Sequence, residues 1–140
     1  MAQQIQDIMT KQIHTVGKDA SLLDVARMMR DQRIGDVLVT NRDGTLCGIV
    51  TDRDIVVRAD ASAKPLDRTP VGDICTGALV KLTPTSSIDE AVSIMRDHAI
   101  RRVPVVRDGH AIGIVTIGDL ARHKDPNSAL AQISAAAPNN

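Results

Sequence analysis

The chain has 140 residues, a formal net charge of zero at pH 7, and no phenylalanine, tyrosine or tryptophan. This length suits one compact domain, and the balanced charge argues against a protein that binds nucleic acid or an anionic membrane. No apolar stretch approaches membrane-spanning length, and the first residues lack the charged and apolar regions of a signal peptide, so we expect a cytoplasmic protein.

The first half of the chain is predicted to alternate short helices and short strands. Ser21 opens a helix, because Asp24 stands three residues later as in a capping box and apolar residues follow at helical spacing. Residues 41–44 form a turn that ends on Gly44. The predicted elements are a helical turn at 5–10, an extended segment at 13–16, a helix from residue 21, strands at 37–39 and 46–50, and a helix at 52–58.

The second half is predicted to repeat this plan. Ser87 and Glu90 have the spacing of a complete capping box, and an apolar stripe follows them. The predicted elements are a helix from residue 87, strands at 103–106 and 111–115, and a closing helix from residue 120. The chain therefore divides into a first repeat at 5–58, a connector at 59–70, a second repeat at 71–124 and a flexible C-terminal tail at 125–140.

Three sequence motifs occur twice, at a spacing of about 65 residues. Residues 48–54 (GIVTDRD) return as residues 113–119 (GIVTIGD). Two shorter motifs upstream repeat in the same order, DIMT at 7–10 as DICT at 73–76 and MRD at 29–31 as MRD at 95–97. With only two copies and a period longer than that of solenoid repeats, the pattern predicts two related α/β units that fold against each other. Two related clefts are expected at their seam.

The repeated Gly-x-x-Thr-x-x-Asp motif lies where a predicted strand ends and a helix begins. One interpretation is purely structural: Thr51 with Asp54, and Thr116 with Asp119, form capping boxes for the free N–H groups of the helix. The other is a nucleotide site, because a helix N-terminus attracts phosphate and a carboxylate there can accept hydrogen bonds from the two hydroxyls of a ribose. The glycine that opens each motif indicates a close approach of the backbone to another group.

Together these motifs resemble a tandem pair of CBS domains, also called a Bateman module, over residues 5–123. The resemblance is carried by both Gly-x-x-Thr-x-x-Asp motifs, by IRRVPV at residues 100–105 and by the opening DIMT motif. The chain is similar to small stand-alone bacterial CBS-pair proteins. The resemblance implies an α/β (α+β) fold in which two β-α-β-β-α repeats pack sheet to sheet with pseudo-twofold symmetry.

The resemblance also implies a regulatory module that senses an adenosine-containing ligand and acts on an effector protein in trans. AMP, ADP or ATP is the expected ligand, with NAD and S-adenosylmethionine as alternatives, and a homodimer is the expected assembly. The alternative function is a ligand-free dimeric interaction scaffold with degenerate clefts. The sequence contains no P-loop and no paired histidine spacing, so we expect neither an enzyme nor a metal site.

By position, the first nucleotide-binding cleft combines residues of both repeats. The resemblance assigns the ribose hydroxyls to Asp54, the phosphates to three arginines, and the adenine to aliphatic side chains, which fits a chain without aromatic residues. The predicted set is Ile49, Thr51, Arg53, Asp54, Leu79, Ile100, Arg101, Arg102 and Pro104.

The second predicted cleft departs from this pattern, because Gly35 and Asp36 stand where the other repeat has Arg101 and Arg102. A carboxylate beside a phosphate is repulsive unless a cation bridges them, so we expect the first cleft to bind a charged nucleotide better. The second cleft is expected to hold adenosine, a nucleotide whose phosphates point elsewhere, or no ligand. Its predicted set is Ile13, Ile34, Gly35, Asp36, Leu38, Ile114, Thr116 and Asp119.

Cys47 and Cys75 are the only cysteines of the chain. One falls in a predicted strand and the other in a predicted helical turn. We interpret them as packed small apolar side chains rather than as a disulfide.

Overall fold

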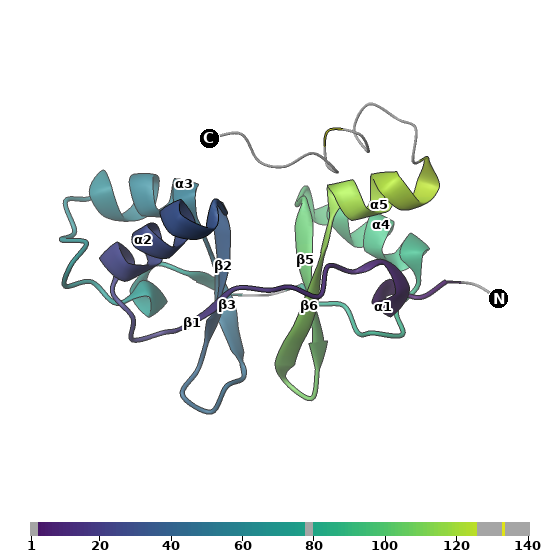
Figure 1. Cartoon of the computed structure of the whole chain (residues 1–140), viewed down its shortest axis with the longest axis horizontal. Helices are drawn as coiled ribbons and strands as arrows, with labels where there is room; N and C mark the ends of the chain where they lie inside the picture. The colour runs from purple at the N-terminus through teal and green to yellow at the C-terminus, as the bar shows by residue number, and fades with distance from the viewer. Residues whose placement is uncertain (1–2, 78–79, 126–132, 134–140) are drawn as a thin grey trace. The chain divides into compact units, whose positions relative to one another are not determined.

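A computed structural model describes residues 3–77, 80–125 and 133, and its elements fall into two compact units. The first unit comprises His14–Ala78, and the second comprises Met1–Ile13 together with Leu79–Asn140. Each unit contains both strands and helices (Figure 1). The chain therefore has the mixed α/β character that the sequence predicts. Within the described residues, no helix combines the length and the apolar composition that crossing a membrane requires.

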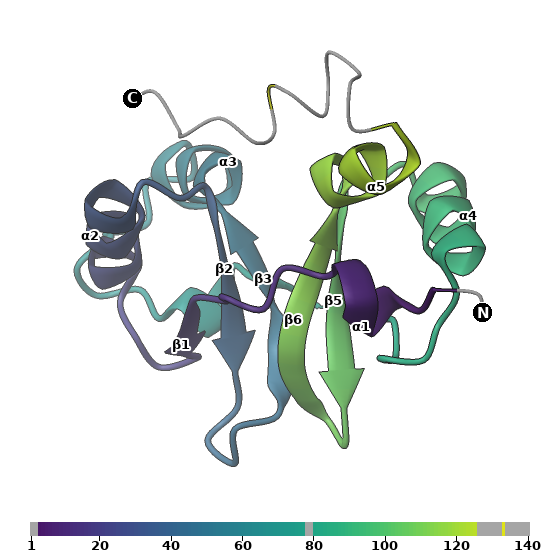
Figure 2. The ribbon, with the colours of Figure 1, turned by 45° about the vertical axis from the view of Figure 1, so that its right-hand side comes forward.

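The first unit is built on a four-stranded sheet with the order β1-β2-β3-β4. Its strands are β1 (Thr15–Gly17), β2 (Asp36–Thr40), β3 (Leu46–Thr51) and β4 (Thr76–Gly77). β1 pairs with β2 in parallel, and the other pairs are antiparallel. Its helical segments are α2 (Leu22–Gln32), α3 (Asp52–Asp54), the π-helix η1 (Ile55–Asp60) and the 3₁₀-helix η2 (Val71–Asp73). α2 and α3 lie on the same side of the sheet in both views (Figures 1 and 2).

The second unit has the same design with fewer strands. β5 (Arg102–Arg107) and β6 (His110–Thr116) form an antiparallel hairpin, and Leu82 adds a parallel bridge to Val105. Its helices are α1 (Ile5–Ile8), α4 (Ile88–His98) and α5 (Ile117–Lys124). As Figure 2 shows, α1 comes from the N-terminal end of the chain yet lies beside β6.

The opening segment of each repeat packs on the unit that is built mainly from the other repeat. The Ile5 N–H donates to the Ser86 carbonyl at 2.8 Å, and at the corresponding place in the first unit the Val71 N–H donates to the Ala20 carbonyl at 2.7 Å. Ile5 and Val71 both have no exposed surface. The repeats of the sequence and the compact units of the structure are therefore two different divisions of the chain.

The helix starts agree with the capping signals, with two differences. Ser21 accepts the Asp24 N–H at 3.1 Å, and Ser87 accepts the Glu90 N–H at 3.0 Å. The reciprocal bond that would complete the capping box predicted at Ser87 is absent among the described residues. The helix predicted at 52–58 is instead a short α-helix followed by a π-helix. In a π-helix the backbone hydrogen bonds join residues that are five apart rather than four.

The predicted connector at 59–70 folds against the first unit. The carbonyls of Thr69 and Leu66 accept the N–H groups of Leu22 and Leu23, each at 3.0 Å. These N–H groups belong to the first turn of α2 and have no partner inside the helix, so the connector completes that helix end. The predicted flexible tail lies outside the described residues except for Asp125 and Ile133.

Candidate nucleotide-binding corners

The first Gly-x-x-Thr-x-x-Asp corner lies where β3 ends and α3 begins. Thr51 is the N-cap: its Oγ1 accepts the Asp54 N–H at 3.0 Å, and Oδ2 of Asp54 accepts the Thr51 N–H at 2.9 Å. The predicted capping box is therefore complete. Asp54 is only half-buried, and among the described residues its Oδ1 accepts no hydrogen bond. One carboxylate oxygen at this helix N-terminus is thus free to accept further bonds.

The second corner has the same capping box but a different environment. Thr116 Oγ1 accepts the Asp119 N–H at 3.1 Å, and Oδ2 of Asp119 accepts the Thr116 N–H at 3.0 Å. Asp119 is only 4% exposed, and it accepts two further interactions. The Thr10 hydroxyl lies 3.2 Å from each of its oxygens, and Arg122 forms an ion pair with Oδ1. This carboxylate is already neutralised and hydrogen-bonded by its own chain.

The equivalent positions of the first unit do not engage Asp54 in this way. Thr76 corresponds to Thr10, but its hydroxyl accepts a hydrogen bond from Arg58 at 3.0 Å. Val57 stands where the second unit has Arg122, and it offers no charge. The two corners therefore share one backbone geometry, while the carboxylate of the first corner keeps more of its acceptor capacity.

In the first unit, strand pairing brings residues that were predicted for the second cleft to the Thr51 corner, which was predicted for the first cleft. Asp36 lies opposite Thr51, and Leu38 lies opposite Ile49. The Asp52 N–H donates to the Gly35 carbonyl at 3.0 Å, which joins the segment before β2 to the start of α3. Ile34 packs against the core of this unit, and Arg53 is exposed on α3.

The arginine pair has the equivalent place in the second unit. Arg102 lies opposite Thr116, and Pro104 lies opposite Ile114. The Ile117 N–H donates to the Arg101 carbonyl at 2.9 Å. Partial desolvation lowers the pKa of the Arg102 guanidinium, which nevertheless stays protonated at neutral pH.

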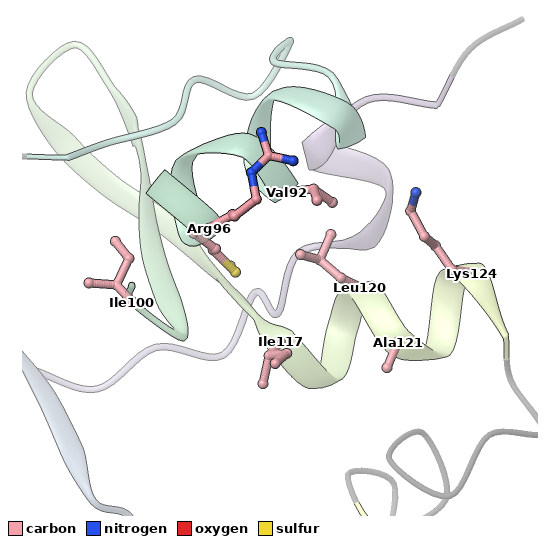
Figure 3. A pocket seen from close by; sticks show the side chains of 8 residues that line it. Val92, Arg96, Ile100, Ile117, Leu120, Ala121 and Lys124 are labelled. Carbon is pink, nitrogen blue, oxygen red and sulfur yellow. The ribbon is translucent and has the colours of Figure 1, made fainter. Parts of the chain in front are cut away.

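The remaining predicted residues are Ile100, Ile13 and Leu79. Ile100 lines a groove between α4 and α5, as Figure 3 shows, and packs against the core of the second unit. Ile13 is half-buried in the same unit, and Leu79 lies outside the described residues. The members of each predicted cleft are thus divided between the two units, and their assembly into clefts stays a prediction.

Two residues that contact the second corner were not predicted from the sequence. Thr10 closes the DIMT motif, whose repetition was the only signal for it, and its contact with Asp119 spans most of the chain. Arg122 stands three residues after Asp119, which is the spacing of an ion pair on a helix surface, so charge patterning could have indicated it.

The duplicated strand-turn-helix corner, one in each α/β unit, defines the class of protein as a paired α/β repeat module. The CBS domain model matches residues 5–60 and 71–125. The chain therefore belongs to the CBS domain family, and it carries two copies of the domain. CBS-pair modules are commonly regulatory and ligand-binding, and the match indicates no enzyme family.

Individual relatives agree with this assignment. CBS domain-containing protein YhcV of Bacillus subtilis is 36% identical over 134 residues, which cover 93% of this chain and 94% of that protein. The crystal structure of Hypoxic Response Protein I, which holds two coordinated zinc ions, has a TM-score of 0.79 at 33% identity and covers 86% of this chain and 98% of its own. The CBS domain pair of MJ0100, solved with 5-methylthioadenosine and S-adenosyl-L-methionine, has a TM-score of 0.75 at 25% identity and covers 91% and 100%.

Metal ligands are not grouped in the part of the chain that the structure describes. No set of three or more histidine, cysteine, aspartate or glutamate side chains there could hold a metal ion.

Proposed function

We propose that this protein is a regulatory module that binds an adenine nucleotide (AMP, ADP or ATP) and acts through a conformational change on a partner protein in trans. The single observation that carries the proposal is the Asp54 carboxylate, which lies at a helix N-terminus with one oxygen unengaged by the described residues. A carboxylate in this position accepts hydrogen bonds from ribose hydroxyls, while the helix N-terminus favours a phosphate.

The solved relative supports the adenosine part of the proposal. The MJ0100 domain pair was solved with two ligands that both contain adenosine. Aliphatic side chains such as Ile49 are the expected contacts for the base, because the chain has no aromatic residue on which a purine could stack. S-adenosylmethionine and NAD contain the same adenosine and are the alternative ligands.

The charged groups support a difference between two ligand sites. We propose that the first cleft joins Asp54 and Thr51 with Arg53, Arg101 and Arg102, whose cations would attract the phosphates. The second would join Asp119 and Thr116 with Gly35 and Asp36. The carboxylate of Asp119 is already paired with Arg122, and this feature favours the nucleotide at the first cleft. Within the units themselves, Asp36 lies opposite Thr51 and Arg102 lies opposite Thr116, so the proposed grouping of Asp36 with Asp119, and of Arg102 with Asp54, depends on how the two repeats assemble.

Ligand binding would act on the partner by shifting the equilibrium between two shapes of the module. A ligand shifts such an equilibrium only by its difference in affinity for the two shapes. We expect this regulation of the partner protein to take place in the cytoplasm.

A ligand panel tests the proposal. Saturating AMP, ADP or ATP should raise the melting temperature, followed by circular dichroism or an extrinsic dye, because a ligand at 100 times its Kd stabilises the folded state by about 2.7 kcal/mol. Adenosine, NAD and S-adenosylmethionine define the specificity, and GMP and inorganic phosphate serve as controls. Millimolar adenine compounds that leave the melting temperature unchanged would favour the scaffold with degenerate clefts.

We further propose a homodimer, which the exposed apolar surface of the helices supports. Val56 is 61% exposed on η1, and Ile117 is 45% exposed on α5. Ile117 also lines the groove between α4 and α5, with a volume of about 390 Å³, in which Val92, Ile100 and Leu120 are visible in Figure 3. Burying such surface against a second copy is favourable at about 25 cal/mol per Å².

Light scattering at micromolar concentration should therefore report a dimer. Ile117→Asp combined with Val56→Asp should give a monomer, because each substitution places a charge on the proposed contact surface. Lys81→Asp changes an exposed charge elsewhere and is the matched control. A wild-type monomer would contradict the proposed assembly.

A further inference from the structure

The two cysteines of the chain lie together in the first unit. The register of β2 and β3 pairs Val39 with Gly48 and then Thr40 with Leu46, so Cys47 is the extra residue of a β-bulge. A bulge re-aims the side chain of its extra residue, and Cys47 packs against the buried core of this unit. Cys75 packs against the same core.

The Cys75 sulfur lies directly over the glycine that follows Cys47. A Cβ atom built on Gly48 would stand 3.1 Å from Sγ of Cys75. The Cys75 thiol donates a weak hydrogen bond to the Gly72 carbonyl at 3.8 Å. Burial, together with the neighbouring Cys47 thiol, raises the pKa of Cys75 to about 11. Both side chains keep partial exposure, and both cysteines are free thiols in this structure.

The second unit fills the same place with an apolar pair. Its hairpin pairs Val105 with Gly113 and then Val106 with Ala111, so Ile112 is the bulge residue that corresponds to Cys47. The side chain of Met9, which corresponds to Cys75, lies over Gly113 at 2.6 Å from a built Cβ. Isoleucine and methionine therefore satisfy the packing at this position. The first unit has cysteine at both members of the pair, which brings together two groups that can react with each other.

We propose that Cys47 and Cys75 are a redox modification site that closes reversibly into an intramolecular disulfide by exchange with a low-molecular-weight disulfide of the glutathione type. One protein thiolate attacks the small disulfide, forms a mixed disulfide and releases the first small thiol. The second protein thiolate then attacks the mixed disulfide at the protein sulfur and releases the second small thiol. Two protein thiols are oxidised, and one small disulfide is reduced to two thiols.

The disulfide would fasten β4 to the bulge of β3. Cys75 immediately precedes Thr76 and Gly77, which pair with Ile49 and Gly48. Thr76, the next residue, pairs with Ile49 on the strand that ends at Thr51, so the modification site lies on the strand that leads into the first corner. Because only a thiolate attacks, and the pKa of Cys75 is raised, closure should become faster as the pH rises through the neutral range.

Thiol trapping of the wild-type protein tests the proposal directly. The protein is equilibrated in mixtures of reduced and oxidised glutathione, quenched in acid and alkylated with N-ethylmaleimide under denaturing conditions. Its mass is then measured by intact-protein mass spectrometry. As the oxidised share rises, we expect a single-chain species that has lost two hydrogen atoms and carries no alkyl group, and dithiothreitol should reverse it. Accumulation of glutathione adducts, a species linked between two chains, or full alkylation at every ratio would overturn the proposal.

Cysteine variants test whether both thiols are required. Cys47→Ser and Cys75→Ser should each stop at one glutathione adduct, because the second thiol is missing. The double variant Cys47→Ile, Cys75→Met reproduces the apolar pair of the second unit, and its melting temperature should be the same in oxidising and reducing buffer. The wild-type melting temperature should rise by at least about 4 °C on oxidation. Equal melting temperatures of the oxidised and reduced wild-type protein would show that no constraining bond has formed.

Discussion

Asp54→Asn should weaken AMP binding by roughly 10- to 100-fold, because it removes the charge from the carboxylate that we assign to the ribose. The asparagine carbonyl can still accept the Thr51 N–H, which Oδ2 of Asp54 accepts at 2.9 Å. The helix cap is therefore kept while the charge is lost. Isothermal titration with AMP measures the change in affinity, and circular dichroism confirms that the variant is folded.

Asp119→Asn is the matched control at the second corner. Its carboxylate is buried, hydrogen-bonded to Thr10 and ion-paired with Arg122. The substitution should therefore lower the melting temperature of the protein and leave its affinity for AMP nearly unchanged. We expect a change in affinity of less than about threefold, which corresponds to a free energy below 1 kcal/mol. An equal loss of affinity in the two variants would contradict the proposed difference between the corners.

The features that the sequence predicted correctly are those with a local signal. The capping boxes at Thr51 and Thr116 follow from a strand, a threonine and an aspartate three residues later. The helices that begin after Ser21 and Ser87 follow from the same kind of signal and from apolar residues at helical spacing. Family membership followed from repeated motifs, and the family model confirms it.

The features that were missed depend on contacts between distant segments. The periodicity of residues 5–10 gives no sign that Ile5 is buried in the core of the other repeat. The contact of Thr10 with Asp119 has the same cause, because local spacing does not specify which unit a segment packs on. The difference between the two aspartates therefore could not be predicted from the Gly-x-x-Thr-x-x-Asp pattern that they share, although the proposed difference between the two clefts depends on it.

The glycines that open the two motifs were predicted to allow a close approach, and the structure identifies what approaches. A Cβ on Gly48 would collide with the carbonyl oxygen of Thr76 and would stand 3.0 Å from its carbonyl carbon. A Cβ on Gly113 would meet Met9 Sδ at 2.6 Å and the Thr10 carbonyl oxygen at 3.0 Å. In both cases the neighbour is the opening segment of the other repeat. The glycines are therefore needed so that the opening segment of each repeat can pack on the other repeat, whether or not a ligand binds.

Gly48→Ala should consequently destabilise the protein by about 1–3 kcal/mol, the usual cost of forcing extra volume into a packed site. The colliding atom is a backbone oxygen held in the pairing of β3 with β4, so relief requires a shift of the strand. Gly113→Ala should cost less, because the nearest atom there is the flexible sulfur of Met9. Urea denaturation followed by circular dichroism measures both changes.

Gly17→Ala is the control for the loss of a glycine as such, because a Cβ at this position meets no heavy atom within 4 Å. Its free energy of unfolding should stay within about 0.5 kcal/mol of the wild-type value, as is usual for surface substitutions. Suppose that Gly48→Ala were as stable as Gly17→Ala. The opening segment of the second repeat would then not pack against β3, which would contradict the packing of each opening segment on the other repeat. The Thr51 corner would then lose the strand that β4 adds beside it.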